Sequence, residues 1–124
     1  MRKKLTKAEE EIMQIIWTKG KVLVSDILDS VGEPRPPHSS VSSIVRILEK
    51  KGFVGHKAYG RTHEYFPIVA KEDYSKFSVR SLISDYFNGS ANSLVSFLVK
   101  ENDLTLKELH DITEQLKNAK KKKL

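Results

Sequence analysis

Hydrophobic residues near the start of the chain recur at intervals of three and four, which is the period of an amphipathic helix. The segment Thr6-Lys-Ala-Glu9 precedes them, and its hydroxyl and glutamate can cap a first helical turn reciprocally. Gly20 favours the left-handed conformation that ends helices, so the pattern predicts a helix from Thr6 to about Lys19. The apolar face of this helix consists of Ala8, Ile12, Met13, Ile15, Ile16 and Trp17.

Two more helices are predicted before residue 52. A short extended piece at residues 22–24 leads into a short helix. Three prolines within residues 34–37 exclude a helix there and predict a rigid connector. The third helix covers residues 39–51 and has Ser39 or Ser40 as its cap. Its buried face is predicted to consist of Val41, Ile44, Val45 and Leu48.

The hydrophobic period then changes from that of a helix to that of strands. Two runs of strand-forming residues flank Gly60-Arg61, which predicts a β-hairpin. With this two-residue turn, Lys57 lies opposite Glu64 as a cross-strand ion pair. Pro67 limits the second strand to an edge or an end. Residues 5–70 therefore read as helix, short strand, helix, helix and hairpin.

From residue 71 on, the pattern is helical throughout. It predicts helices over residues 72–88 and 91–101, and a last helix opened by a second capping box at Thr105-Leu-Lys-Glu108. A unit of about 50 residues buries these apolar faces poorly by itself. The excess predicts a homodimer, with folding back onto the N-terminal part as the alternative. The predicted interface comprises Leu82, Ile83, Tyr86, Phe87, Leu94, Val95, Phe97, Leu98, Leu109, Ile112 and Leu116.

The charge distribution supports a division of the chain at residue 70. The formal net charge is +6, and residues 1–70 contain 12 basic and 8 acidic side chains, whereas residues 71–119 contain 6 and 8. We therefore predict a polyanion-binding domain over residues 1–70, a helical dimerisation domain over 71–119 and a frayed basic tail over 120–124. On charge alone, a plain soluble domain is an equal alternative.

Composition argues against an enzyme, a cofactor and a metal site. The chain has no cysteine, which excludes disulfides and thiolate chemistry, and it has no glycine-rich phosphate loop and no G-x-S-x-G motif. The four histidines lack ligand spacing, and Glu9, Glu10 and Glu11 are interpreted as a solvated helix start. Neither a membrane span nor an apolar signal segment is recognisable, so we expect a cytoplasmic protein without membrane insertion.

A helix pair followed by a basic hairpin is the layout of a winged helix-turn-helix, and its side chains suit DNA. Small hydroxyls at the start of the third helix can approach base edges in the major groove, while cations contact phosphates. The candidates for base contacts are Ser39, Ser40, Ser42 and Ser43. The candidates for phosphate or wing contacts are Arg46, Lys50, Lys51, His56, Lys57 and Arg61. A protein–protein adaptor remains the alternative from another class.

Four segments together resemble the BlaI/MecI penicillinase-repressor family. They are LTKAEEEIMQIIW, SSVSSIVRILEKKGFV, the hairpin end with Gly60, Arg61, Tyr65 and Pro67, and NSLVSFLVKENDLTLKEL. The resemblance covers about 115 residues. It implies a mostly α-helical winged-helix repressor with a small hairpin, whose three C-terminal helices form a homodimer on an inverted-repeat operator of double-stranded DNA.

The resemblance also implies a role in antibiotic resistance and a mode of release. In this family a membrane-bound sensor metalloprotease leads to cleavage within the dimer helices, and the matching bond here is Ser96–Phe97, where the family has an Asn before the bond. Many members have an Arg where this chain has Ile47, and the arginine here is Arg46. A repressor switched by a small molecule held among the C-terminal helices is the second alternative.

Overall fold

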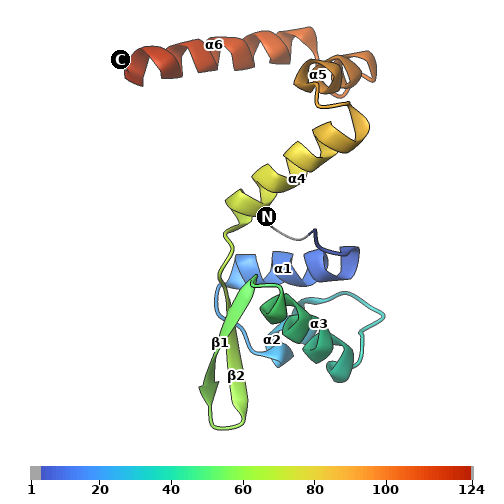
Figure 1. Ribbon diagram of the computed structural model, residues 1–124, viewed down its shortest axis with the longest axis vertical. Coiled ribbons are helices and arrows are strands. Elements are labelled where there is room, and N and C mark those ends of the chain that lie inside the picture. The colour runs from blue at the N-terminus through green and yellow to red at the C-terminus, as the bar shows by residue number, and fades with distance from the viewer. Residues whose placement is uncertain (1–3, 124) are drawn as a thin grey trace. The chain divides into compact units, whose positions relative to one another are not determined.

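The computed structural model describes the backbone of residues 4–123 and the side chains of residues 4–119. Within this range it has six helices and one two-stranded antiparallel sheet, as the mostly helical prediction requires (Figure 1). The elements are α1 (Lys7–Lys19), α2 (Val24–Ser30), α3 (His38–Lys50), β1 (Val54–Tyr59), β2 (Thr62–Pro67), α4 (Lys71–Tyr86), α5 (Ala91–Lys100) and α6 (Leu106–Lys123).

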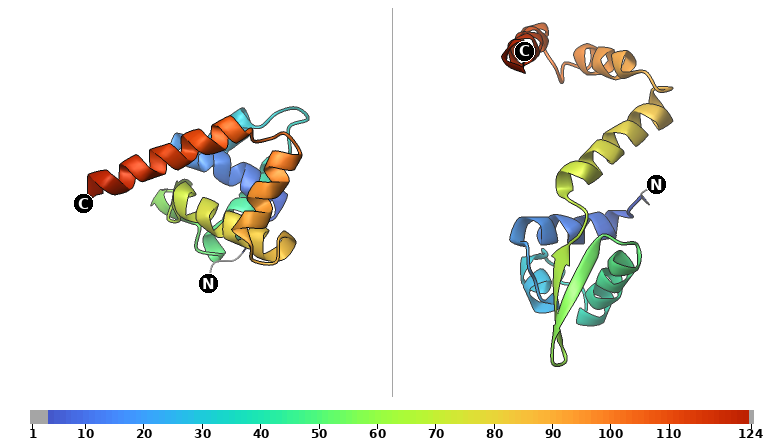
Figure 2. Two further views of the ribbon diagram at one scale, coloured as in Figure 1. Left: turned by 90° about the horizontal axis from the view of Figure 1, so that it is seen from above. Right: turned by 60° about the vertical axis from the view of Figure 1, so that its left-hand side comes forward.

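The first compact unit contains the first three helices and the hairpin. Helix α1 contacts α2, α3 and β2, while α3 contacts α2 and β1 (Figure 2). A helix pair with a hairpin beside its second helix is a winged helix-turn-helix, so the fold predicted for this part is confirmed. Its core consists of Leu5, Ile12, Met13, Ile16, Val22, Ile27, Leu28, Val41, Val45, Leu48, Phe53, Val54, Tyr65 and Tyr74.

Local sequence signals fix both ends of α1 as predicted. The backbone N–H of Glu9 donates to Thr6 Oγ1 at 3.2 Å, and the backbone N–H of Thr6 donates to Glu9 Oε1 at 2.9 Å. These reciprocal bonds satisfy two of the amide donors that every helix start leaves without a partner. At the other end, Gly20 has φ +84°, and its N–H donates to the carbonyl of Ile16 at 2.8 Å.

Helix α3 begins earlier than the serines suggested. Its N-cap is Pro37, which caps through no side chain, so the prediction that Ser39 or Ser40 caps this helix is wrong. Proline already has the φ of about −65° that suits this boundary, and Pro37 has φ −62°. Within the described residues, neither serine hydroxyl makes a hydrogen bond. Both hydroxyls are therefore available to a ligand.

The hairpin has the predicted register. Lys57 lies opposite Glu64, and Gly60, with φ +64°, lies in the turn. The predicted ion pair between these two described side chains is not formed, and Lys57 Nζ lies 5.5 Å from the centroid of the Tyr59 ring. The predicted extended piece before α2 is a single bridge: Val22 N donates to the carbonyl of Tyr65 at 2.9 Å, and Tyr65 N donates back at 2.7 Å. These two bonds attach the hairpin to the segment that enters α2.

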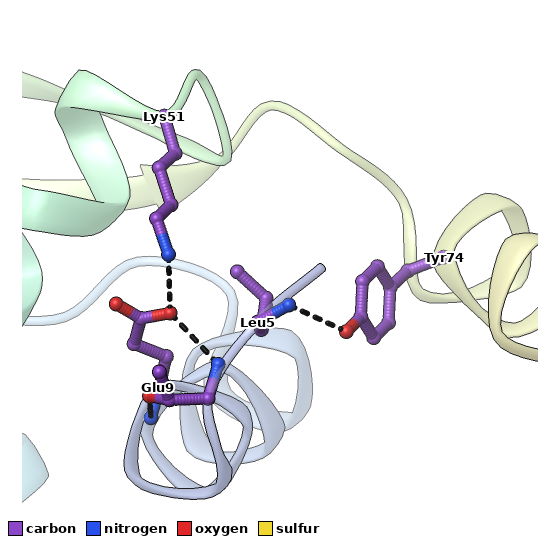
Figure 3. Close-up of polar contacts among 5 residues, drawn as sticks. Leu5, Glu9, Lys51 and Tyr74 are labelled. Atoms are coloured by element: carbon purple, nitrogen blue, oxygen red, sulfur yellow. Dashed lines mark hydrogen bonds and ion pairs between the residues drawn. The ribbon is translucent and has the colours of Figure 1, made fainter. Parts of the chain in front are cut away.

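The first unit extends to Ser78, past the boundary predicted at residue 70. The phenol of Tyr74, in the first turn of α4, accepts a hydrogen bond from Leu5 N at 3.1 Å (Figure 3). Its ring lies 5.9 Å from that of Trp17 and 5.5 Å from that of Phe53, centroid to centroid. Trp17 is partly buried, as predicted, and its indole N–H donates to the carbonyl of Val69 at 2.8 Å.

The second compact unit begins at Val79 and comprises the rest of α4 together with α5 and α6. The predicted capping box at α6 is present, because Glu108 N donates to Thr105 Oγ1 and Thr105 N donates to Glu108 Oε1, both at 3.0 Å. Helix α6 includes residues 120–123, which we predicted as a frayed tail, and Leu124 lies outside the described residues. Between residues 79 and 119, where side chains are described, no residue is buried.

Candidate nucleic-acid interface

Helix α3 has one buried face and one outward face. Val41, Val45 and Leu48 are fully buried against the first unit, and this anchors the helix. At about 100° per residue, the outward face lies opposite this apolar stripe. The exposed side chains of α3 are His38, Ser39, Ser40, Ser43, Arg46, Ile47 and Lys50.

Three of the four predicted base-contact serines lie on the outward face. Ser39, Ser40 and Ser43 are exposed, whereas Ser42 is half-buried at the side of the helix. The hydroxyl of Ser42 lies 3.3 Å from Nδ1 of His38, one turn earlier. The fold therefore groups three hydroxyls on one surface and places the fourth beside a histidine.

A groove of about 530 Å³ runs beside α3, between the start of α2 and strand β2. It brings together Arg46 of α3 and Arg61 of the hairpin turn, two of the predicted phosphate contacts. Since two guanidinium groups and several hydroxyls line it, the groove suits a polyanion backbone. The remaining lining residues are Leu23, Val24, Ser25, His38, Ser42, Thr62, His63 and Tyr65.

The sequence did not single out Ser25, His38, Thr62 or His63, which also line this groove. For two of them a signal was present. Side chains two residues apart in an extended segment point to the same face, and His63 lies two residues after Arg61. His38 precedes Ser42 by four residues and Arg46 by eight, so it shares their face of α3. Ser25 could not be found from such periods, because it joins the groove only through the packing of α2 against α3.

The hairpin is braced against the end of α3. Nδ1 of His56 lies 2.5 Å from Oε2 of Glu49, and the His56 ring stacks on that of His63 with centroids 4.3 Å apart. His56 thus has a partner within the protein, and its phosphate contact stays a prediction. Burial raises the pKa of Tyr65, the charge of Glu49 adds to this rise, and Arg46 offsets part of it.

Lys51 makes an ion pair within the first unit, and its phosphate contact stays a prediction. Its Nζ lies 2.7 Å from Oε1 of Glu9, and the two groups are only 21% and 7% exposed (Figure 3). The interpretation of Glu9 as solvated is therefore wrong. Burial would raise the pKa of Glu9, but the hydrogen bonds from Lys51 and Thr6 and the charge of Lys51 lower it overall. The pair links the start of α1 to the end of α3.

The predicted dimer residues leave apolar surface uncovered in the second unit. Ile83, Phe87, Leu94, Val95, Leu98 and Leu109 are half-buried. The more exposed members are Leu82 (42%), Tyr86 (74%), Phe97 (47%), Ile112 (44%) and Leu116 (60%). Apolar side chains gain free energy when another surface removes them from water. The helices of the second unit thus have exposed apolar side chains that an interface could bury.

The Ser96–Phe97 bond lies within α5. Both residues are exposed, and they line a shallow groove with Asn92, Ser93 and Lys100. The ring of Phe97 lies 5.6 Å from that of Phe87, centroid to centroid. A protease that cleaves this bond needs local unwinding of α5, because the backbone there is hydrogen-bonded as a helix.

The described part of the chain has neither a cluster of metal ligands nor a membrane-spanning helix. No group of three or more metal-ligating side chains occurs among these residues. No helix in the same range is long and apolar enough to cross a membrane.

Comparisons with known proteins point the same way. The chain matches the family model described as penicillinase repressor over residues 5–118. It is 27% identical over 122 residues to the penicillinase repressor of Bacillus licheniformis, covering 94% of each protein. It is 28% identical over 120 residues to the methicillin resistance regulatory protein MecI of Mammaliicoccus sciuri, covering 96% of this chain and 94% of that protein. The solution structure of the DNA-binding domain of the repressor BlaI matches with a TM-score of 0.51 and 25% identity, covering 60% of this chain and 94% of that domain.

Proposed function

The chain belongs to the penicillinase repressor family and is a transcriptional repressor, and we propose that it binds an inverted-repeat operator as a homodimer. One observation carries this proposal. The exposed hydroxyls of α3 lie on the helix that borders a groove lined by Arg46 and Arg61. Hydroxyl groups suit base edges and guanidinium groups suit phosphates, so one surface offers both kinds of contact.

We assign the contacts as follows. Each protomer lays α3 in a major groove, where Ser39, Ser40 and Ser43 contact base edges. The exposed cations around them contact the phosphates and set the position of the helix. These cations are Arg46, Lys50, Lys57 and Arg61.

The dimer contact is assigned to the second unit, whose apolar side chains are uncovered. Because two-fold symmetry of the protein requires two-fold symmetry of the DNA, the half-sites lie one helical turn or a multiple apart.

The names of relatives refer to penicillinase and to methicillin resistance. We propose that this repressor acts in the cytoplasm and likewise controls antibiotic-resistance genes.

Release is assigned to proteolysis of the Ser96–Phe97 bond after signalling by a membrane-bound sensor metalloprotease. A cut in α5 separates α6 from the rest of its chain and removes part of the dimer surface. The two DNA-binding units then lose the gain in effective concentration that linkage provides. Mass spectrometry of the repressor from induced cells tests this step, and an intact chain in fully induced cells would contradict it.

The experiment that tests the proposed function is a mobility-shift titration against the DNA upstream of the chain's own gene, with random DNA of equal length as the control. We expect a single dimeric complex on the upstream DNA, with an affinity that falls steeply as salt rises. Equal and weak binding to both DNAs would contradict the proposal and favour the adaptor function.

The same titration at several salt concentrations tests the groove. Replacing Arg61→Ala should weaken binding to operator and random DNA alike and reduce the slope of log affinity against log salt by about 1, since one phosphate contact is lost. The matched control is Arg80→Ala, which removes the same charge from α4 and should leave the slope unchanged. An unchanged slope for Arg61→Ala would remove the hairpin from the interface.

A further inference from the structure

The outward face of α3 contains one side chain that phosphate or polar base contacts do not explain. Ile47 is 44% exposed, and it is the one apolar residue among the exposed side chains of the described helix. Ile47 lies outside the buried stripe of Val41, Val45 and Leu48, because one residue along the helix turns it about 100° away from Leu48. The fold of the first unit therefore does not require it.

The neighbours of Ile47 on the outward face of α3 are residues to which we assign DNA contacts. Ile47 follows Ser43 by four residues and Ser40 by seven, so the three side chains form one row along the helix. Lys50 lies one turn further on, and Arg46 flanks the row on the side of the groove. When α3 lies in a major groove with its serines toward the bases, Ile47 faces the bases as well.

The base edges in the major groove offer an apolar side chain one partner. The thymine C5-methyl group is the one methyl group exposed there, among hydrogen-bond donors, acceptors and aromatic C–H edges. An isoleucine that faced only donors and acceptors would leave them without partners and water, which is unfavourable. Contact with a methyl group instead removes apolar surface from water on both sides.

We propose that Ile47 contacts the C5-methyl group of a thymine in each half-site and so selects T·A at that position. The inference rests on the proposed function, since it requires α3 to lie in a major groove. It assigns a specificity-determining role to the one exposed apolar residue of α3 in the described part of the chain. We expect Ile47→Ala to fold, because Ile47 is not among the buried residues of the core.

The test replaces each thymine of the operator half-sites in turn by uracil, which deletes the methyl group and nothing else. Affinities are measured for the unmodified chain, for Ile47→Ala and for the control Lys50→Ala. We expect one thymine position per half-site at which uracil weakens binding of the unmodified chain about fourfold, the effect of burying one methyl group. Ile47→Ala should bind the thymine-containing operator about fourfold more weakly than the unmodified chain does. Uracil at the responsive position should not change the affinity of this variant.

Lys50→Ala should lower the affinity for all templates equally and keep the full uracil effect. The inference is overturned if no position responds to uracil, or if Ile47→Ala responds as strongly as the unmodified chain. Failure of the proposed function has a different signature, since the unmodified chain would then not distinguish the operator from random DNA in the first titration. Thermal unfolding of each variant verifies that it is folded.

Discussion

Replacing Ile112→Glu and Leu116→Glu together should convert the repressor to a monomer and lower its affinity for the full operator about 100-fold or more. The two side chains lie on one face of α6 and are 44% and 60% exposed. Charges placed there oppose the removal of this face from water, while the isolated chain loses no buried contact. The affinity falls because each half-site is then bound alone, without the gain from linkage.

The control for this pair is His110→Glu with Asn118→Glu. Both control residues are exposed on α6, and each lies two positions from one of the substituted residues. The control adds the same number of glutamates to the same helix, but away from the apolar face. Analytical ultracentrifugation gives the oligomeric state, and titration of a single half-site gives the intrinsic affinity, which both double variants should share with the unmodified chain.

A dimer that persists in the double variant, with unchanged operator affinity, would place the dimer contact elsewhere.

The family assignment affects the adaptor and ligand-switch alternatives differently. Membership of the penicillinase repressor family favours a repressor over an adaptor. It does not distinguish release by proteolysis from release by a ligand, which is why the state of the Ser96–Phe97 bond in induced cells is the deciding observation.

The parts of this fold that sequence predicted best are those controlled by residues close together in the chain. Both capping boxes depend on residues three apart, Thr6 with Glu9 and Thr105 with Glu108. The hairpin register follows from a two-residue turn, and it places Lys57 opposite Glu64 as expected. In each case a short segment determines the geometry and its neighbours do not override it.

One error concerns a residue whose partner is distant in sequence. Glu9 appeared solvated because it begins a helix, but Lys51, 42 residues later, pairs with it and leaves it only 7% exposed. The cap of α3 is an error of another kind, because Pro37 already has the φ that suits the boundary and starts the helix before the serines. Helical and strand periods describe the face on which a side chain lies, and they do not identify the residue that will cover that face.

The candidate site was only partly predictable for the same reason. The outward serines of α3 and the cations near the hairpin turn follow from period and charge. The groove that joins Arg46 to Arg61 also needs the start of α2, which sequence could not place beside them. The first unit also continues into α4, because an aromatic ring in that helix completes its core.

That ring belongs to Tyr74, and replacing Tyr74→Ala should cost the first unit about 3–5 kcal/mol of stability. The side chain is 5% exposed and contacts three other aromatic rings, those of Trp17, Phe53 and Phe77. Tyr74→Phe should cost about 1–2 kcal/mol, since it removes only the phenol oxygen that accepts the hydrogen bond from Leu5 N. Urea unfolding followed by Trp17 fluorescence measures both.

The comparison is clearest in the monomeric background with glutamate substitutions on α6, where dimerisation no longer contributes to stability. There the matched control is Tyr86→Ala, because Tyr86 lies on the same helix but is 74% exposed. An equal urea midpoint for Tyr74→Ala and Tyr86→Ala would show that the start of α4 does not support the first unit. A large difference would show that the start of α4 supports the first unit, and we then expect a cut at Ser96–Phe97 to leave the DNA-binding unit folded with its α4 anchor intact. Release of the operator would then result from loss of pairing between two folded units, and the cleaved N-terminal piece would keep the intrinsic affinity for a single half-site.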